Sequence, residues 1–160
     1  MTRNPFLNKI SFALLLTILL YGCLRLGNFE KNIEIPKQDW NYNFMPTVAF
    51  TISDTTKLYD VYITLRHTEA YAYRNLWIYL HSRQPSDKNF QKERFELVLQ
   101  DDQGRWLGRG MDDIYELNIP IFTRIRFTQT GEYTLKLEQI MRDNPLKGIM
   151  NAGIRIEQSE

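Results

Sequence analysis

Cysteine is nearly absent from this chain of 160 residues: Cys23 is the only one. A single cysteine excludes an internal disulfide framework and every zinc motif that needs several cysteines. Histidine is also scarce, and neither His67 nor His81 stands in an HExxH motif. Basic and acidic residues are nearly equal in number, and the net charge is +1. The sequence therefore does not predict a general nucleic-acid binder. No apolar run reaches the roughly 20 residues that a membrane-spanning helix needs.

The motifs of common enzyme classes are missing as well. No serine lies in a G-x-S-x-G elbow, and no G-x-x-x-x-G-K phosphate loop is present. The paired carboxylates Asp101–Asp102 and Asp112–Asp113 stand in predicted loops without EF-hand spacing, so they would bind calcium only if the loops meet. These carboxylates could also serve as the catalytic pair of a glycosidase. This is a weaker hypothesis, because the spacing in sequence does not give the distance between two carboxylates in space. We therefore predict no catalytic residues, no metal and no cofactor.

A secretory signal is present at the N-terminus. Arg3 and Lys9 precede an apolar run over residues 10–21, and no acidic residue comes before Glu30. A basic region followed by 7–15 apolar residues is typical of a signal peptide. The sequence therefore predicts a secreted or envelope protein.

The residues LYGC at 20–23 resemble a bacterial lipobox, although Tyr21 is bulkier than the residue usual there. The resemblance implies cleavage after residue 22, a diacylglyceryl group on the Cys23 thiol and fatty acylation of the new amine. This covalent lipid would be an anchor, and several chains hold a protein firmly because each buried CH₂ contributes about 0.8 kcal/mol. Leu24, in place of the Asp that retains some lipoproteins in the inner membrane, favours the outer membrane. The alternative is an uncleaved N-terminal anchor with an incidental cysteine.

The remaining chain is predicted as a lipidated tether over residues 23–39 and one domain over 40–160. A hydrophobic period of two residues dominates after Pro46, with turn-forming residues between the segments. Strands are predicted at 47–53, 59–67, 75–83, 94–100, 105–110, 121–127, 133–141 and 153–158. Pro120 argues against a central strand at its position, because proline cannot donate to the ladder.

Eight short strands without a long amphipathic helix predict an all-β fold. An antiparallel β-sandwich, immunoglobulin-like or jelly-roll-like, fits this spacing, and a small β-barrel is the alternative. One face of each strand is polar, so each sheet is expected to have a solvated face. His67 and His81 are expected at strand ends or on the surface, whereas Trp40 and Trp106 are expected in the core or in hairpin packing.

Four aromatic and basic residues form a candidate interaction surface. Tyr62 and Arg66 share the polar face of one predicted strand, and Trp77 and Tyr79 share that of the next. If these two strands pair, an aromatic and basic patch results. Because Trp, Tyr and Arg anchor interfaces, one hypothesis is a protein or glycan contact. The alternative is that this face belongs to the core or is covered by the tether.

Two longer patterns resemble a known family. D-x-x-G-x-W-x-G-x-G covers residues 101–110, and Q-x-M-R-x-x-x-L-x-G-I covers residues 139–149. With DVYITLRH at 60–67, NLWIYL at 75–80 and the lipobox, they look like the gliding-motility lipoprotein family GldH of the Bacteroidetes. The resemblance extends from about Trp40 to Glu157.

This resemblance implies a non-enzymatic cell-envelope lipoprotein, needed for gliding in bacteria whose gliding machinery is tied to type IX secretion. Only Cys23 carries a family role, as the lipidated residue. The expected partners are a membrane, through the lipid, and other gliding or secretion proteins of the envelope, with no nucleic acid and no small-molecule ligand. The alternative function is a carbohydrate-binding lipoprotein with Trp77 and Tyr79 as its stacking platform.

Overall fold

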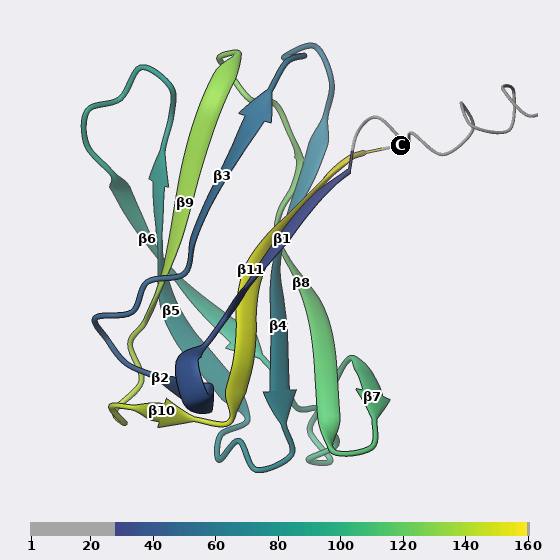
Figure 1. The fold of residues 1–160 in the computed structure, drawn as a ribbon. Helices are drawn as coiled ribbons and strands as arrows, with labels where there is room; N and C mark the ends of the chain where they lie inside the picture. Colours follow the sequence, from purple (N-terminus) through teal and green to yellow (C-terminus); the bar gives the residue numbers. More distant parts are fainter. Residues whose placement is uncertain (1–27, 160) are drawn as a thin grey trace, which may run out of the picture.

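The computed structural model describes residues 28–159, which form antiparallel sheets joined by loops and one short 3₁₀ helix, η1 (Pro36–Gln38) (Figure 1). The five-stranded sheet has the order β1 (Phe29–Glu34), β11 (Ile149–Gln158), β4 (Tyr59–Thr68), β8 (Ile114–Ile125) and β7 (Arg109–Met111). The four-stranded sheet has the order β3 (Thr47–Ile52), β9 (Gly131–Gln139), β5 (Asn75–Arg83) and β6 (Gln91–Val98). A small ribbon pairs β2 (Asp39–Trp40) with β10 (Leu146–Lys147).

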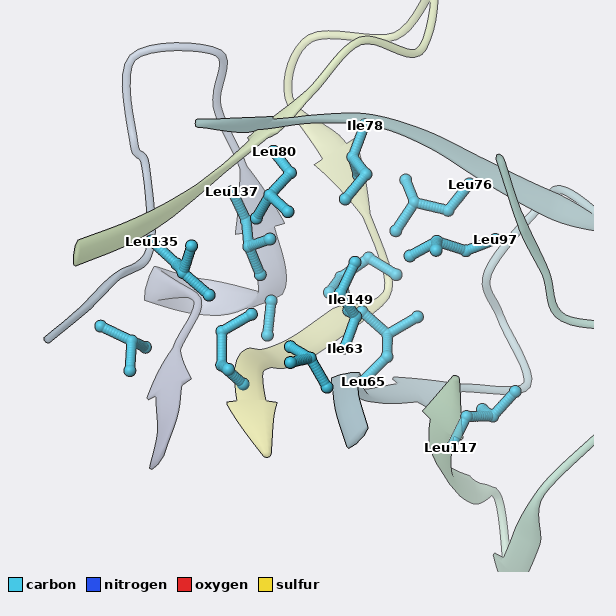
Figure 2. Packing of buried hydrophobic residues seen from close by; sticks show 14 of the residues in the cluster. Ile63, Leu65, Leu76, Ile78, Leu80, Leu97, Leu117, Leu135, Leu137 and Ile149 are labelled. Atoms are coloured by element: carbon cyan, nitrogen blue, oxygen red, sulfur yellow. The ribbon is translucent and has the colours of Figure 1, made fainter. Parts of the chain in front are cut away.

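The two larger sheets face each other and enclose the core, so the predicted antiparallel β-sandwich is confirmed and the barrel is not formed (Figure 1). Strand β3 shows the reason at residue level, because buried and exposed residues alternate along its whole length. In Figure 2, Leu80 and Leu137 approach from the four-stranded sheet, while Ile63 and Ile149 approach from the five-stranded sheet. Burial of such side chains stabilises each by roughly 1.5–3 kcal/mol relative to exposure.

The predicted tether is wrong over its second half. Strand β1 pairs along its entire length with β11, from Phe29 opposite Ile156 to Glu34 opposite Asn151. Helix η1 and β2 follow directly, and Trp40 is fully buried, as expected for this residue. The domain therefore includes Phe29–Trp40. Residues 1–27, with the predicted signal peptide and Cys23, lie outside the described part of the chain.

Strand β8 runs through Pro120 without interruption, although the sequence predicted a strand only from residue 121. Pro120 lies opposite Tyr62 of β4, beside a register shift in the ladder. On its other side β8 pairs with β7 only from Ile114 to Glu116. Within the described strands, Pro120 therefore occupies an edge position, where a missing N–H costs no ladder hydrogen bond.

The sandwich has two ends with different loops (Figure 1). Phe29, where β1 starts, lies opposite Ile156 near the end of β11, so both termini of the described chain leave from one end. We call this the N-terminal end; it also carries the loops 53–58, 84–90 and 126–130. The opposite end, here the distal end, carries residues 35–46 and the loops 69–74, 99–108, 112–113, 140–145 and 148.

Candidate interaction surface at the distal end

The four predicted surface residues do not form one patch. Tyr62 and Arg66 lie on β4 in the five-stranded sheet, whereas Trp77 and Tyr79 lie on β5 in the four-stranded sheet. Each pair alternates with buried core residues and therefore lies on the outer face of its own sheet. The two outer faces are on opposite sides of the sandwich, so these strands do not pair and the condition for a single patch is not met.

The faces of Trp77 and Tyr79 are covered by cations from the neighbouring strand β6. The Arg94 guanidinium lies 4.9 Å from the Trp77 ring centroid, and the Lys92 ammonium lies 3.8 Å from that of Tyr79. Lys92 also lies 3.0 Å from Glu138, whose carboxylate is 2.7 Å from Nε2 of His81. These contacts occupy ring faces that a sugar would need for stacking, so the arrangement does not favour the carbohydrate platform.

Tyr62 and Arg66 also have partners on their own sheet. The Arg155 guanidinium lies 6.0 Å from the Tyr62 ring centroid and donates to Glu157 at 2.6 Å. Nε of Arg66 lies 4.0 Å from a carboxylate oxygen of Glu116. Tyr62 and Arg66 therefore both lie beside charged neighbours of the same sheet.

The first family pattern, residues 101–110, builds a tight turn at the distal end. Asp101 accepts hydrogen bonds from the backbone N–H groups of Gln103 and Arg105, both at 2.9 Å, and from Nε of Arg105 at 2.7 Å. The backbone hydrogen bond from Arg105 is the main reason why the pKa of Asp101 lies below its usual value. The general acid of a glycosidase needs a raised pKa, so Asp101 does not fit that role, and its hydrogen bonds are those of a turn residue.

The glycines of this pattern allow close packing against β8. Gly108 has φ +92°, and a Cβ there would lie 2.3 Å from the carbonyl oxygen of Glu116. A Cβ on Gly110 would lie 3.0 Å from the Tyr115 ring. Trp106, between the turn and these glycines, packs on the His67 ring with centroids 4.5 Å apart. The pattern therefore positions a half-buried tryptophan over the end of β4.

The second family pattern, residues 139–149, is centred on a buried glutamine. Gln139 is fully buried, and its Nε2 donates to the carbonyl oxygens of Trp40 at 3.1 Å and Asp143 at 3.2 Å. Its Oε1 accepts from the N–H of Met141 at 2.9 Å. One side chain thus connects β9, β2 and the loop 140–145. Sequence reasoning missed this role, although a polar residue continuing the buried series Leu135 and Leu137 was a usable signal.

His67 was expected at a strand end or on the surface; it lies next to the last residue of β4, but it is not on the surface. The side chain is fully buried, with Nδ1 2.9 Å from the carbonyl oxygen of Thr68. Nε2 has no hydrogen-bond partner among the described residues, and the ring packs against Trp106 and Tyr115. Burial disfavours the charged form and lowers the pKa of His67, and the hydrogen bond to Thr68 opposes this only in part. The sequence did contain a signal for this burial. His67 lies two residues after Leu65 and therefore on the same, buried face of β4.

Exposed apolar side chains gather at the distal end. In the part of the chain that the structure describes, five large hydrophobic side chains are exposed, all in loops or strand ends of this end: Tyr42, Met45, Val98, Leu107 and Met111. We call these five residues the distal surface. Met111 is the most open, with 71% of its surface accessible. Single exposed apolar residues are ordinary, but their restriction to one end marks it as a candidate contact surface.

Comparison with known proteins identifies the family of this chain. A model of the GldH lipoprotein family matches residues 27–156, which includes both patterns and every strand up to most of β11. The chain belongs to the GldH lipoprotein family. It is 27% identical over 157 residues to a protein named gliding motility lipoprotein GldH homolog from Christiangramia forsetii, covering 93% of this chain and 95% of that protein. It is also 27% identical over 155 residues to gliding motility lipoprotein GldH from Flavobacterium johnsoniae, covering 92% and 94%.

Two observations concern the chemistry available to this family member. Within residues 28–159, no group of three or more His, Cys, Asp or Glu side chains is arranged to hold a metal ion. Over the same residues, no helix has the length and apolar content needed to cross a membrane.

Proposed function

We propose that this protein is a lipid-anchored component of the bacterial gliding machinery, held to the cell envelope through Cys23 and acting by protein contact without catalysis. The observation that carries the proposal is the placement of both family patterns and all five distal-surface residues at one end of the sandwich. The relatives' names support the gliding role, and the lipobox-like LYGC supports the anchor.

The length of chain before β1 defines how the domain would sit on the membrane. Cys23 precedes Phe29 by six residues (29 − 23 = 6), and extended chain advances at most about 3.5 Å per residue, so the reach is about 20 Å. The N-terminal end would therefore remain close to the bilayer. Strand β11 has ten residues at about 3.4 Å each, so the distal end would stand roughly 30 Å farther out.

The proposed partner is a protein of the gliding or type IX secretion apparatus in the envelope. The proposed site of anchoring is the outer membrane. An exposed apolar surface on a neutral domain favours a protein partner, because buried apolar and aromatic residues dominate the energetics of protein interfaces. Several charged side chains of the outer sheet faces are already in ion pairs and therefore have less to offer to a partner.

Complementation of a deletion strain tests the anchor. We expect the wild-type chain to restore gliding and Cys23→Ala to fail, because the domain is then not held at the membrane. Membrane fractionation and mass spectrometry of the N-terminal peptide check the lipid directly. A matched control, Ser53→Ala in an exposed loop, should behave as wild type. Full restoration of gliding by a secreted chain without lipid would contradict anchoring.

A further inference from the structure

An apolar cavity of about 210 Å³, open to solvent on one side, lies between the two sheets near the N-terminal end. Its walls come from both sheets and from the loop that joins β8 to β9. The main lining side chains are Phe50, Val61, Phe122, Phe127, Tyr133 and Leu135. No residue of the distal surface lines this cavity, so the cavity is a separate site.

The cavity wall suits a hydrocarbon guest. The Phe50 ring lies 5.7 Å from Phe127 and 5.6 Å from Tyr133, centroid to centroid. The Tyr133 hydroxyl donates to the carbonyl oxygen of Gln129 at 3.0 Å, so its proton is not available to a polar ligand. Apolar cavities accept apolar ligands, as an engineered cavity of about 150 Å³ that binds benzene shows.

The mouth of the cavity is polar, whereas its interior is not. Gln84, Arg126 and Thr128 also border it, and Oγ1 of Thr128 donates to the Gln84 side chain at 3.0 Å. This mouth lies among loops 84–90 and 126–130, at the end of the sandwich from which residues 1–27 leave. An apolar guest would therefore enter from the side that the proposed anchor places next to the bilayer.

The start of β1 connects this cavity to the anchor. Phe29 packs against Phe50, with ring centroids 5.8 Å apart, so the first strand residue touches the cavity wall. Cys23 lies six residues before it (29 − 23 = 6), within a reach of about 20 Å. A guest on so short a tether competes at an effective concentration of the order of millimolar, which favours it over free molecules.

We propose that the end of one acyl chain of the lipid on Cys23 inserts into this cavity, while the other chains remain in the bilayer. The inference rests on the proposed function, because it needs the lipid on Cys23. The volume admits the terminal methylenes of a chain and not its full length. Insertion would fix the N-terminal end against the membrane and keep the distal surface directed away from it.

Photo-crosslinking with a fatty acid that carries a diazirine near its chain end tests the proposal in cells expressing the full chain. After irradiation, tryptic peptides of the purified protein are analysed by mass spectrometry. We expect the lipidated Cys23 peptide to be joined to peptides that line the cavity, chiefly residues 127–136. Ser82→Trp, at the cavity wall, and Val61→Phe should each abolish this crosslink. Thr51→Trp, exposed on the outer face of β3, should retain it and serves as the matched control.

The other outcomes separate failure of this inference from failure of the anchor. If Cys23 carries the probe but crosslinks only to phospholipid, the inference is overturned and the anchor stands. If the cavity peptides crosslink to phospholipid even in Cys23→Ser, the occupant is a bilayer lipid and the inference is again overturned. If Cys23 carries no probe at all, the anchor itself fails and the inference fails with it.

Discussion

At the scale of single residues, Gln139 holds the distal end together because three backbone groups depend on its amide. Gln139→Leu fills a similar volume but leaves these groups without partners in a buried site. Each unsatisfied buried polar group costs roughly 1–3 kcal/mol, and two of these three groups are only partly buried, so we expect a total loss of about 3–5 kcal/mol. Urea unfolding of the purified protein measures this change. Gln91→Leu, exposed at the start of β6, should change the free energy of unfolding by less than about 0.5 kcal/mol, as most surface substitutions do.

His67 links stability to pH. Its pKa is lowered in the folded protein because burial disfavours the charged form. Below about pH 6.5 the unfolded chain binds a proton that the folded protein does not, so the free energy of unfolding falls with decreasing pH, by up to about 1.4 kcal/mol per pH unit. Tyr71 faces the ring, and burial raises the pKa of its hydroxyl, so it stays neutral in this range.

His67→Leu should remove this dependence. Urea unfolding at pH 5.5 and 7.5 would show a smaller difference in the variant than in the wild type. His81 is present in both proteins, so it does not contribute to the difference between them. An equal difference in the two proteins would contradict the assignment of the pH dependence to His67.

At the scale of elements, the pairing of β1 with β11 depends on a glycine. Gly153 has ordinary φ, but a Cβ there would lie 2.2 Å from the carbonyl oxygen of Lys31 and 2.7 Å from Oγ1 of Thr64. Gly153→Ala should displace β1 and cost about 1–3 kcal/mol through overpacking. Faster hydrogen exchange of the β1 amides is the measurement.

Gly104→Ala, in the loop between β6 and β7, is the control for Gly153→Ala. Gly104 has φ +78°, and a Cβ at this position would meet no other atom within 4 Å, so only backbone strain opposes alanine there. We expect a local cost of roughly 1 kcal/mol and unchanged exchange in β1. Protection of β1 that is the same in Gly153→Ala as in the wild type would contradict the crowding argument.

Alternation predicts strands well where one face is buried and the other is solvated. Residues 75–83 and β5 coincide, because Leu76, Ile78 and Leu80 are buried between half-exposed neighbours. Strand β1 escaped prediction since Lys31, on the face that carries Phe29 and Ile33, is exposed and breaks the apolar series. The strand predicted for β8 was too short because the sequence does not show whether Pro120 lies at the edge or in the centre of a sheet.

At the scale of the whole molecule, the period of a strand reveals its buried face but not the sheet that it joins. Strands β4 and β5 follow each other closely in the chain, yet the loop 69–74 crosses from one sheet to the other. For this reason the predicted patch of Tyr62, Arg66, Trp77 and Tyr79 divides between two faces. The converse also holds, since residues 101–110 and 139–149 are far apart in sequence and both lie at the distal end.

We therefore expect function to depend on a domain that is anchored at one end and makes contact at the other. The decisive test is the spreading of colonies of a deletion strain complemented with Leu107→Asp and Met111→Asp together, at membrane levels matched to wild type. Both side chains are exposed, so the fold should be retained, while charge opposes burial in an apolar interface. Thr51→Asp, exposed at the other end of the sandwich, is the matched control. We expect loss of spreading with the distal pair and normal spreading with the control; normal spreading with the distal pair would contradict contact through the distal surface.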